Sequence, residues 1–141
     1  MDAAVSKVLI VRSGSEHYAL DMMTVQEVVY HPELTILPQI NGFITGMCRW
    51  RDKQIPVVDL GLFLGKSIPA RSGDIVITVT SGNAAGLLVE EIGPIVEIPG
   101  SAYIPVDKNL AQEQEKIFQA FEYQEELVFI IESKAMIKHF S

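Results

Sequence analysis

The sequence predicts an all-β fold organised as two similar barrel-like halves. Three observations support this prediction: many short runs rich in Val and Ile, turns of Gly, Pro and Asn between them, and few helical segments. Short strands separated by such turns are typical of barrels and sandwiches, whereas a parallel α/β sheet alternates with longer helices. A chain of 141 residues can bury its own hydrophobic core without a disulfide or a metal, so one domain is expected.

The first elements along the chain are predicted strands. Residues 8–11 and 17–20 are apolar runs on either side of the turn residues Ser13-Gly14-Ser15, which indicates a hairpin. Residues 25–29 follow as an acid set among apolar residues. Residues 53–60 form another apolar run and are predicted to be a strand.

A short helix is predicted at residues 60–64. Asp59, which precedes it, is a residue type that caps free backbone N–H groups at a helix start. Gly65 is a natural stop, because glycine adopts the left-handed conformation that often ends a helix.

The second half repeats this pattern. Residues 75–80 and 85–89 flank a Ser-Gly-Asn turn and form a second predicted hairpin, about 68 positions after the first. Residues 126–133 match the earlier run at 53–60. Ser133 is then the predicted N-cap of a C-terminal helix at 134–140.

The repeat divides residues 1–141 into two lobes, roughly 7–66 and 73–141, and leaves open whether strands are exchanged between them. One stretch, 109–121, has an ambiguous pattern. Its apolar residues fit either a helix or a loop that leads into a strand, and its Gln and Glu content favours the helix.

Charge and targeting features exclude several classes of partner and location. The net charge is −7, with 11 basic and 18 acidic residues, so nucleic acid and anionic bilayers should repel the chain. The N-terminal residues lack the basic and apolar regions of an export signal, and no apolar run approaches the length that crosses a bilayer. Together with a single cysteine, these features predict a cytoplasmic protein without direct membrane contact.

The histidines and acids give no support for a metal, a cofactor or a catalytic residue. His17, His31 and His139 are far apart and have no ligand spacing with one another or with Cys48. Acids at strand ends are too numerous to indicate an acid and base pair. The sequence therefore predicts no catalytic, metal-binding or cofactor-binding residue, and the chain is expected not to be an enzyme.

Cys48 lies in the most unusual segment, between basic and aromatic residues. Two arginines beside it can in principle activate a thiol. Strand alternation favours another arrangement, in which Arg49 and Arg51 point one way while Cys48 and Trp50 point the other. Cys48 is then a small core residue, and Arg51 is left to bind a carboxylate within the fold, such as Glu27, or on a partner.

The segment from Gly42 to Leu60 resembles the signature of the CheW-like domain family. That signature has a glycine, an apolar pair, Asn-Leu-Arg-Gly, a short gap and Ile-Pro-Val-Val-Asp-Leu, and residues 55–60 match its last part. Residues 18–21 with 25–28 are similar to its early strands, Pro38 matches its loop proline, and residues 86–92 resemble its second-half motif. The resemblance spans roughly residues 7–138.

The sequence departs from the family pattern at several positions. The Asn-Leu-Arg-Gly element is replaced by Arg49, Trp50, Arg51 and Asp52, so its arginine remains and its turn glycine is lost. Ala120 replaces a usual glycine and Glu132 replaces a usual aspartate. These changes point to a divergent member whose partner surface is altered.

The resemblance implies a fold and a function. The fold is two packed, five-stranded, SH3-like β-barrels with short helices. The function is that of a non-enzymatic adaptor, which couples chemoreceptors to a sensor histidine kinase in a chemotaxis or pilus-motility array. Its partners are the cytoplasmic tip of a receptor and the regulatory domain of the kinase. The alternative is a detached regulatory module that binds the kinase without the receptor and competes with a true coupling protein.

The predicted protein-binding residues follow from the same resemblance. A receptor helix is expected to dock on apolar residues around Glu27, and Arg51 is expected to contact a partner. The full set is Val25, Glu27, Val28, Val29, Arg51, Leu87 and Val89. The apolar members of this set are equally compatible with burial in a barrel core, because Val and Leu are among the most frequently buried residues.

Overall fold

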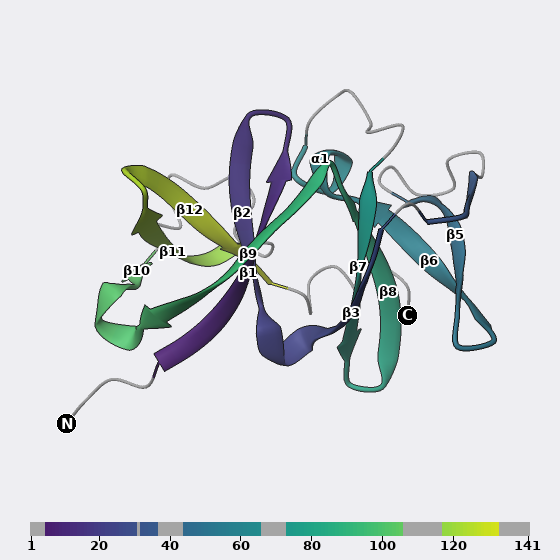
Figure 1. The fold of residues 1–141 in the computed structure, drawn as a ribbon, viewed down its shortest axis with the longest axis horizontal. Helices are drawn as coiled ribbons and strands as arrows, with labels where there is room; N and C mark the ends of the chain where they lie inside the picture. The colour runs from purple at the N-terminus through teal and green to yellow at the C-terminus, as the bar shows by residue number, and fades with distance from the viewer. Residues whose placement is uncertain (1–4, 31, 37–43, 66–72, 106–116, 133–141) are drawn as a thin grey trace.

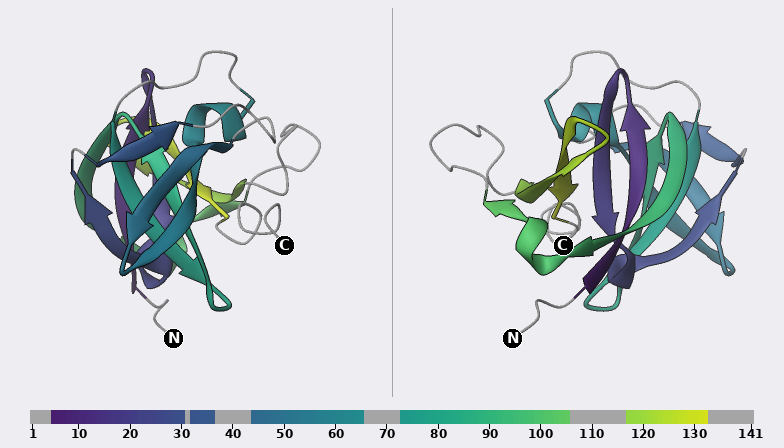
Figure 2. Two further views of the ribbon diagram at one scale, coloured as in Figure 1. Left: turned by 90° about the vertical axis from the view of Figure 1, so that its right-hand side faces the viewer. Right: turned by 60° about the vertical axis from the view of Figure 1, so that its left-hand side comes forward.

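Two six-stranded sheets, arranged as two lobes side by side, make up most of the computed structural model (Figure 1). The structure describes residues 5–30, 32–36, 44–65, 73–105 and 117–132. The all-β class and the SH3-like two-barrel architecture are confirmed, while each sheet has six strands where the resemblance implied five. Figure 2 shows the same lobes in two further views.

Lobe A, on the left in Figure 1, contains the sheet with strand order β10-β11-β12-β2-β1-β9. Its strands are β1 (Val5–Ser13), β2 (Glu16–Asp21), β9 (Glu91–Pro99), β10 (Ile104–Pro105), β11 (Ile117–Tyr123) and β12 (Glu126–Ile131). The short 3₁₀ helix η2 (Gly100–Ala102) joins β9 to β10.

Lobe B contains the sheet with strand order β3-β7-β8-β6-β5-β4. Its strands are β3 (Val25–Val29), β4 (Leu34–Ile36), β5 (Ile44–Trp50), β6 (Lys53–Asp59), β7 (Asp74–Thr80) and β8 (Asn83–Val89). The 3₁₀ helix η1 (Met22–Thr24) connects β2 in lobe A to β3 in lobe B.

The two halves of the chain exchange their first hairpins. The β1–β2 hairpin joins β9–β12 in lobe A, and the β7–β8 hairpin joins β3–β6 in lobe B. Each lobe therefore takes strands from both predicted segments, 7–66 and 73–141. The strand orders match when β1–β6 are placed on β7–β12, so the internal repeat is confirmed.

Each exchanged hairpin is held by a parallel strand pair. Val57 of β6 lies beside Gly86 of β8, and Ile130 of β12 lies beside Ala19 of β2. The two pairs are equivalent, because Ile130 lies 73 positions after Val57 and Gly86 lies 67 positions after Ala19. The small residues suit these central positions: a Cβ atom added at Gly86 would lie 2.9 Å from Ile75 Cγ2.

The main core cluster crosses the boundary between the lobes. It unites buried residues of β1 and β2 with buried residues of β6, α1, β7 and β8. Its members are Leu9, Val11, Tyr18, Leu20, Val58, Leu60, Phe63, Val76, Ala85, Leu87, Val89 and Ile131. Separate clusters fill lobe A and lobe B, and the shared cluster fixes the lobes against each other.

The predicted short helix is present as α1 (Leu60–Phe63). The Asp59 side chain accepts a hydrogen bond from Leu62 N at 3.1 Å, and Gly65 has φ 89° just after the helix. The prediction of a helix was wrong for residues 117–121, which belong to strand β11 because Ala120 and Phe121 pack into lobe A. Residues 109–116 and the expected C-terminal helix, with its cap Ser133, lie outside the described residues.

We predict that Asp59→Ala lowers the free energy of unfolding by about 1–2 kcal/mol, as expected for loss of an N-cap acceptor. Asp59→Asn keeps a side-chain oxygen at the same position and should retain most of the stability. Denaturant unfolding of both variants checks this. Equal losses for Ala and Asn would show that the buried charge, and not the cap, is what stabilises α1.

Candidate functional site

A groove runs between the lobes and has β3 of lobe B as one wall and β9 of lobe A as the other. Its volume is about 400 Å³. The lining residues are mostly apolar: Leu9, Met22, Val25, Gln26, Glu27, Val28, Tyr30, Ile92, Gly93 and Ile95. Leu9 belongs to the shared core, so the floor of the groove rests on the packed boundary between the lobes.

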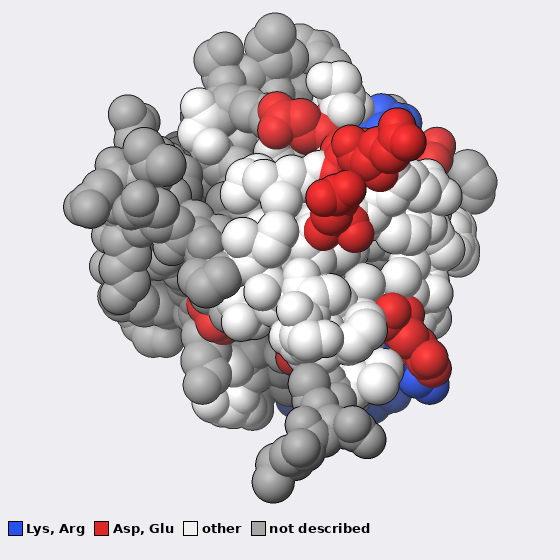
Figure 3. All heavy atoms as spheres, turned by 90° about the vertical axis from the view of Figure 1, so that its left-hand side faces the viewer, with Lys and Arg blue, Asp and Glu red and all other residues white. Residues whose placement is uncertain are grey.

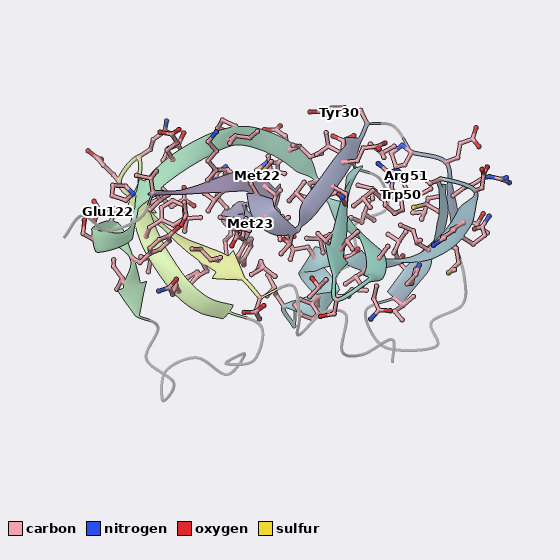
Figure 4. The ribbon with its side chains drawn as sticks, turned by 90° about the horizontal axis from the view of Figure 1, so that it is seen from below. Met22, Met23, Tyr30, Trp50, Arg51 and Glu122 are labelled. Atoms are coloured by element: carbon pink, nitrogen blue, oxygen red, sulfur yellow. The ribbon has the colours of Figure 1, made fainter. Side chains whose placement is uncertain are left out.

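The exposed apolar residues of the groove form its upper surface. Tyr30 is 58% exposed and Ile95 is 56% exposed, while Met23, next to the lining residue Met22, is 92% exposed. Met22 and Tyr30 flank the two ends of β3 (Figure 4). Surfaces with several large exposed apolar side chains often serve as interaction sites in other proteins.

A charged and aromatic corner adjoins the β3 wall. Trp50 Nε1 donates a hydrogen bond to Glu27 Oε1 at 3.4 Å, and the Arg51 guanidinium stacks over the Trp50 ring at 4.7 Å (Figure 4). Arg51 and Asp52 form the β5–β6 turn, with φ 50° and φ 63°. The family pattern has a glycine at this turn position. Asp52 occupies it here with a left-handed backbone conformation, which a short polar side chain tolerates.

The structure differs from the predicted arrangement of β5 and the turn that follows it. Arg49 and Cys48 do lie on opposite faces of β5, but Arg51 is in the turn and does not share the direction of Arg49. The contact to Glu27 comes from the indole of Trp50, and Arg51 contacts Trp50 itself. Arg49 instead pairs with Asp52 at 3.5 Å.

The structure brings together part of the predicted binding set. Val25, Glu27 and Val28 line the groove. Val29 packs with the core cluster of lobe B. Leu87 and Val89 were placed on the docking surface in error, because β8 is a central strand and buries both side chains in the shared core.

Sequence reasoning missed the residues that complete the groove. Met22 and Tyr30 flank β3 on the same wall, and Ile92 and Ile95 form the opposite wall. The signal was present in the repeat, because residues 92–96 occupy the place in the second half that residues 25–29 occupy in the first. Exchange of the hairpins brings these two segments face to face.

Acidic side chains gather at the far end of lobe A (Figure 3). Glu122 and Glu125 lie exposed near and in the β11–β12 turn, and Glu126 is 3.2 Å from His17 Nδ1. At the crossing between β8 and β9, Glu90 accepts from Arg12 Nη1 at 3.1 Å and from Gly14 N at 2.6 Å. These contacts tie strands together. Among the described residues that line the groove, none is Lys or Arg.

Buried polar groups give no sign of catalytic activation. Cys48 is 5% exposed, and desolvation raises the pKa of its thiol, which disfavours the thiolate. Desolvation, with Glu16 nearby, also raises the pKa of Tyr18. The prediction that Cys48 packs as a small apolar residue is confirmed.

Metal and membrane features were also considered. No group of three or more potential ligands occurs among the described residues. His31 and His139 lie outside them. Within the same part of the chain, no helix has the length and apolar character that crossing a membrane requires.

Known proteins that are similar in sequence identify the family of this chain. The family model of the CheW-like domain matches residues 7–141. The chain belongs to the CheW-like domain family. Membership of this family supports the prediction of a non-enzymatic adaptor.

Several CheW-like relatives share sequence and structure with the chain. It is 32% identical to Protein PilI of Pseudomonas aeruginosa over 68% of its length and 52% of that protein. It is 24% identical to the Chemotaxis protein CheW of Klebsiella aerogenes over 69% of its length and 60% of that protein. The chain thus matches just over half the length of these curated relatives.

A solved CheW-like structure has the same fold. The scaffolding protein TtCheW of Thermoanaerobacter tengcongensis superposes with a TM-score of 0.82 at 26% identity. The match covers 92% of this chain and 90% of that one, so it includes both lobes.

The buried thiol predicts low reactivity. In the native protein at pH 8, Cys48 should react with a chromogenic disulfide reagent at least about tenfold more slowly than in the urea-unfolded chain, because burial withholds the thiolate. The reaction is followed by absorbance with and without urea. A native rate above that of the unfolded chain would contradict this assignment and restore Cys48 as a nucleophile.

Proposed function

We propose that the chain is a cytoplasmic adaptor that couples a chemoreceptor to a sensor histidine kinase in a chemotaxis or pilus-motility array. Family membership and the likeness to CheW, PilI and a scaffolding protein support this proposal. The observation that carries it is the apolar groove between the lobes, since such a groove accepts the apolar face of a helix.

The receptor tip is proposed to dock in this groove. Met22, Val25 and Val28 on one wall face Ile92 and Ile95 on the other. Docking a helix here removes exposed apolar area from water, and the shared core beneath keeps the walls at a fixed separation. Such a preformed site requires little reordering of the adaptor when it binds.

The kinase regulatory domain is proposed to contact the β5–β6 turn. Arg51 is exposed at this turn, and its stacking on Trp50 restricts the guanidinium before binding. A restrained guanidinium pairs with a carboxylate on a partner at lower entropic cost than a free one.

A second candidate function is a detached regulatory module that binds the kinase without the receptor. The altered β5–β6 corner favours it, because Trp50 takes the contact to Glu27 at the edge of the groove and places an indole beside the docking surface. This candidate predicts kinase binding by a chain that does not bind any receptor tip.

Substitution in the groove tests receptor docking. Ile95→Asp should weaken binding to the cytoplasmic tip fragment of the cognate receptor by at least about tenfold, because it places a charge in the apolar surface. Calorimetry with the tip fragments encoded in the same genome measures this. Val5→Asp is the matched control, since Val5 is 60% exposed in β1 and lies outside the groove lining.

Equal effects of Ile95→Asp and Val5→Asp would argue against docking in the groove. Absence of binding to every receptor tip, together with binding to a kinase, would replace the coupling role by the detached module.

A charge reversal tests the kinase contact. Arg51→Glu should weaken binding to the kinase regulatory domain by about tenfold, as reversal of a specific charge contact does. Arg49→Glu changes net charge equally in the same hairpin and should have a smaller effect. Trp50 is the only tryptophan of the chain, so its fluorescence reports whether the corner stays folded. Equal losses for both variants would indicate a general field effect and not a contact of Arg51.

A further inference from the structure

The walls of the groove are related by the internal repeat. In lobe B, Val28 of β3 pairs with Val76 of β7, and in lobe A, Ile95 of β9 pairs with Leu9 of β1. A shift of 67 positions along the chain carries Leu9 to Val76 and Val28 to Ile95. Val28 and Ile95 are therefore equivalent positions on opposite walls.

A second pair of lining residues obeys the same relation. Val25 pairs with Thr78 and Ile92 pairs with Val11. The same shift of 67 positions carries Val11 to Thr78 and Val25 to Ile92. The apolar surface thus presents Val and Ile at matching places on both walls.

This relation is an approximate two-fold rotation. The repeat maps lobe A onto lobe B and lobe B onto lobe A, so applying it twice returns each lobe to its place. The rotation carries Val25 and Val28 of the β3 wall onto Ile92 and Ile95 of the β9 wall, so it exchanges the middle of the two walls and reverses the direction along the groove. Leu9, Met22 and Tyr30 have no repeat equivalents among the described lining residues. The central apolar residues alone therefore accept a helix in either direction.

Charge breaks this symmetry. Glu27 is the charged residue among the described residues that line the groove, and its repeat equivalent in β9, Pro94, is uncharged and is not among the lining residues. Glu91 and Glu97 of β9 are exposed but are not part of the lining. Trp50 Nε1 donates to Oε1 of Glu27, which orients this carboxylate on the β3 wall.

We propose that Glu27 determines the direction in which a helix docks, by pairing with a lysine or arginine on one flank of that helix. This inference rests on the proposed docking function. Turning a docked helix end for end moves each of its flanks to the opposite wall. A helix with basic residues along one flank of its apolar stripe is then held with that flank against β3, where Glu27 lies.

The proposal is tested with two synthetic amphipathic helical peptides that share a leucine stripe. One carries lysines on the left flank and glutamines on the right, the other carries the reverse, and each has a nitroxide at its C-terminus. Paramagnetic broadening of backbone amide signals shows which end of the groove the nitroxide occupies. The two peptides should broaden opposite ends, near Met23 for one and near Tyr30 for the other.

Variants change the charge at position 27 without changing the apolar surface. In Glu27→Lys, the lysine flank of each peptide is repelled from β3, so each peptide should bind in the reversed direction. In the matched control Glu27→Gln, each peptide should broaden both ends, and its affinity should fall by about two- to fivefold, the range of an exposed ion pair. Thermal unfolding verifies that the variants fold.

The outcomes separate this inference from the docking function. Binding of both peptides with both ends broadened in the wild-type protein would overturn the role of Glu27 and leave docking intact. A direction that does not reverse in Glu27→Lys would do the same. Failure of either peptide to bind the groove would overturn docking as well as direction.

Discussion

The parallel pairing of β6 with β8 and of β12 with β2 is the constraint on which the rest of the structure depends. Each pair attaches a hairpin from one half of the chain to the sheet of the other half. Without this pairing, the strands of each half would expose unpaired backbone N–H and C=O groups, and the apolar side chains of the shared core would be exposed to water. The pairing also places β1 and β2 against β6, α1 and β8, and this contact creates the largest buried cluster, which belongs to neither lobe alone. Neither lobe is therefore expected to be stable without the other.

The groove is a direct consequence of the exchange. After each exchanged hairpin, the chain crosses to the other lobe, through η1 on one side and Glu90 on the other, and continues as β3 or β9. These two strands are therefore edge strands of different sheets that face each other across the shared core. Val25, Val28 and Ile92 are partly buried against the shared core, and Ile95 stays 56% exposed, so the groove has apolar walls above a filled core. The proposed docking of a partner helix uses this surface.

Charged residues lie beside the β3 wall of the groove and at the far end of lobe A. An indole connects Glu27 to the β5–β6 turn, and Arg51 covers that indole from outside. The opposite end of the molecule carries the acidic β11–β12 region (Figure 3). The equivalent turns of the two lobes share left-handed backbone conformations, at Arg51 and Asp52 and at Gln124 and Glu125, but differ in charge. The repeat thus gives the two lobes the same strand order, while the residues at their equivalent turns differ in charge.

Local alternation and turn chemistry predicted the all-β class, both hairpins and the Asp59-capped helix, because each depends on a few neighbouring residues. The internal repeat emerged from comparing such patterns about 68 positions apart, and the family resemblance pointed to Val25, Glu27 and Val28. Only the folded structure shows that β11 continues as a strand through Phe121, that Leu87 and Val89 are core, and that Ile92 and Ile95 face β3. A local pattern shows that a Val or Leu seeks burial, but not which face of a sheet the other lobe covers. That choice was made by the hairpin exchange, whose contacts join residues distant in the chain, from 29 positions apart for Val57 and Gly86 to 111 positions apart for Ala19 and Ile130.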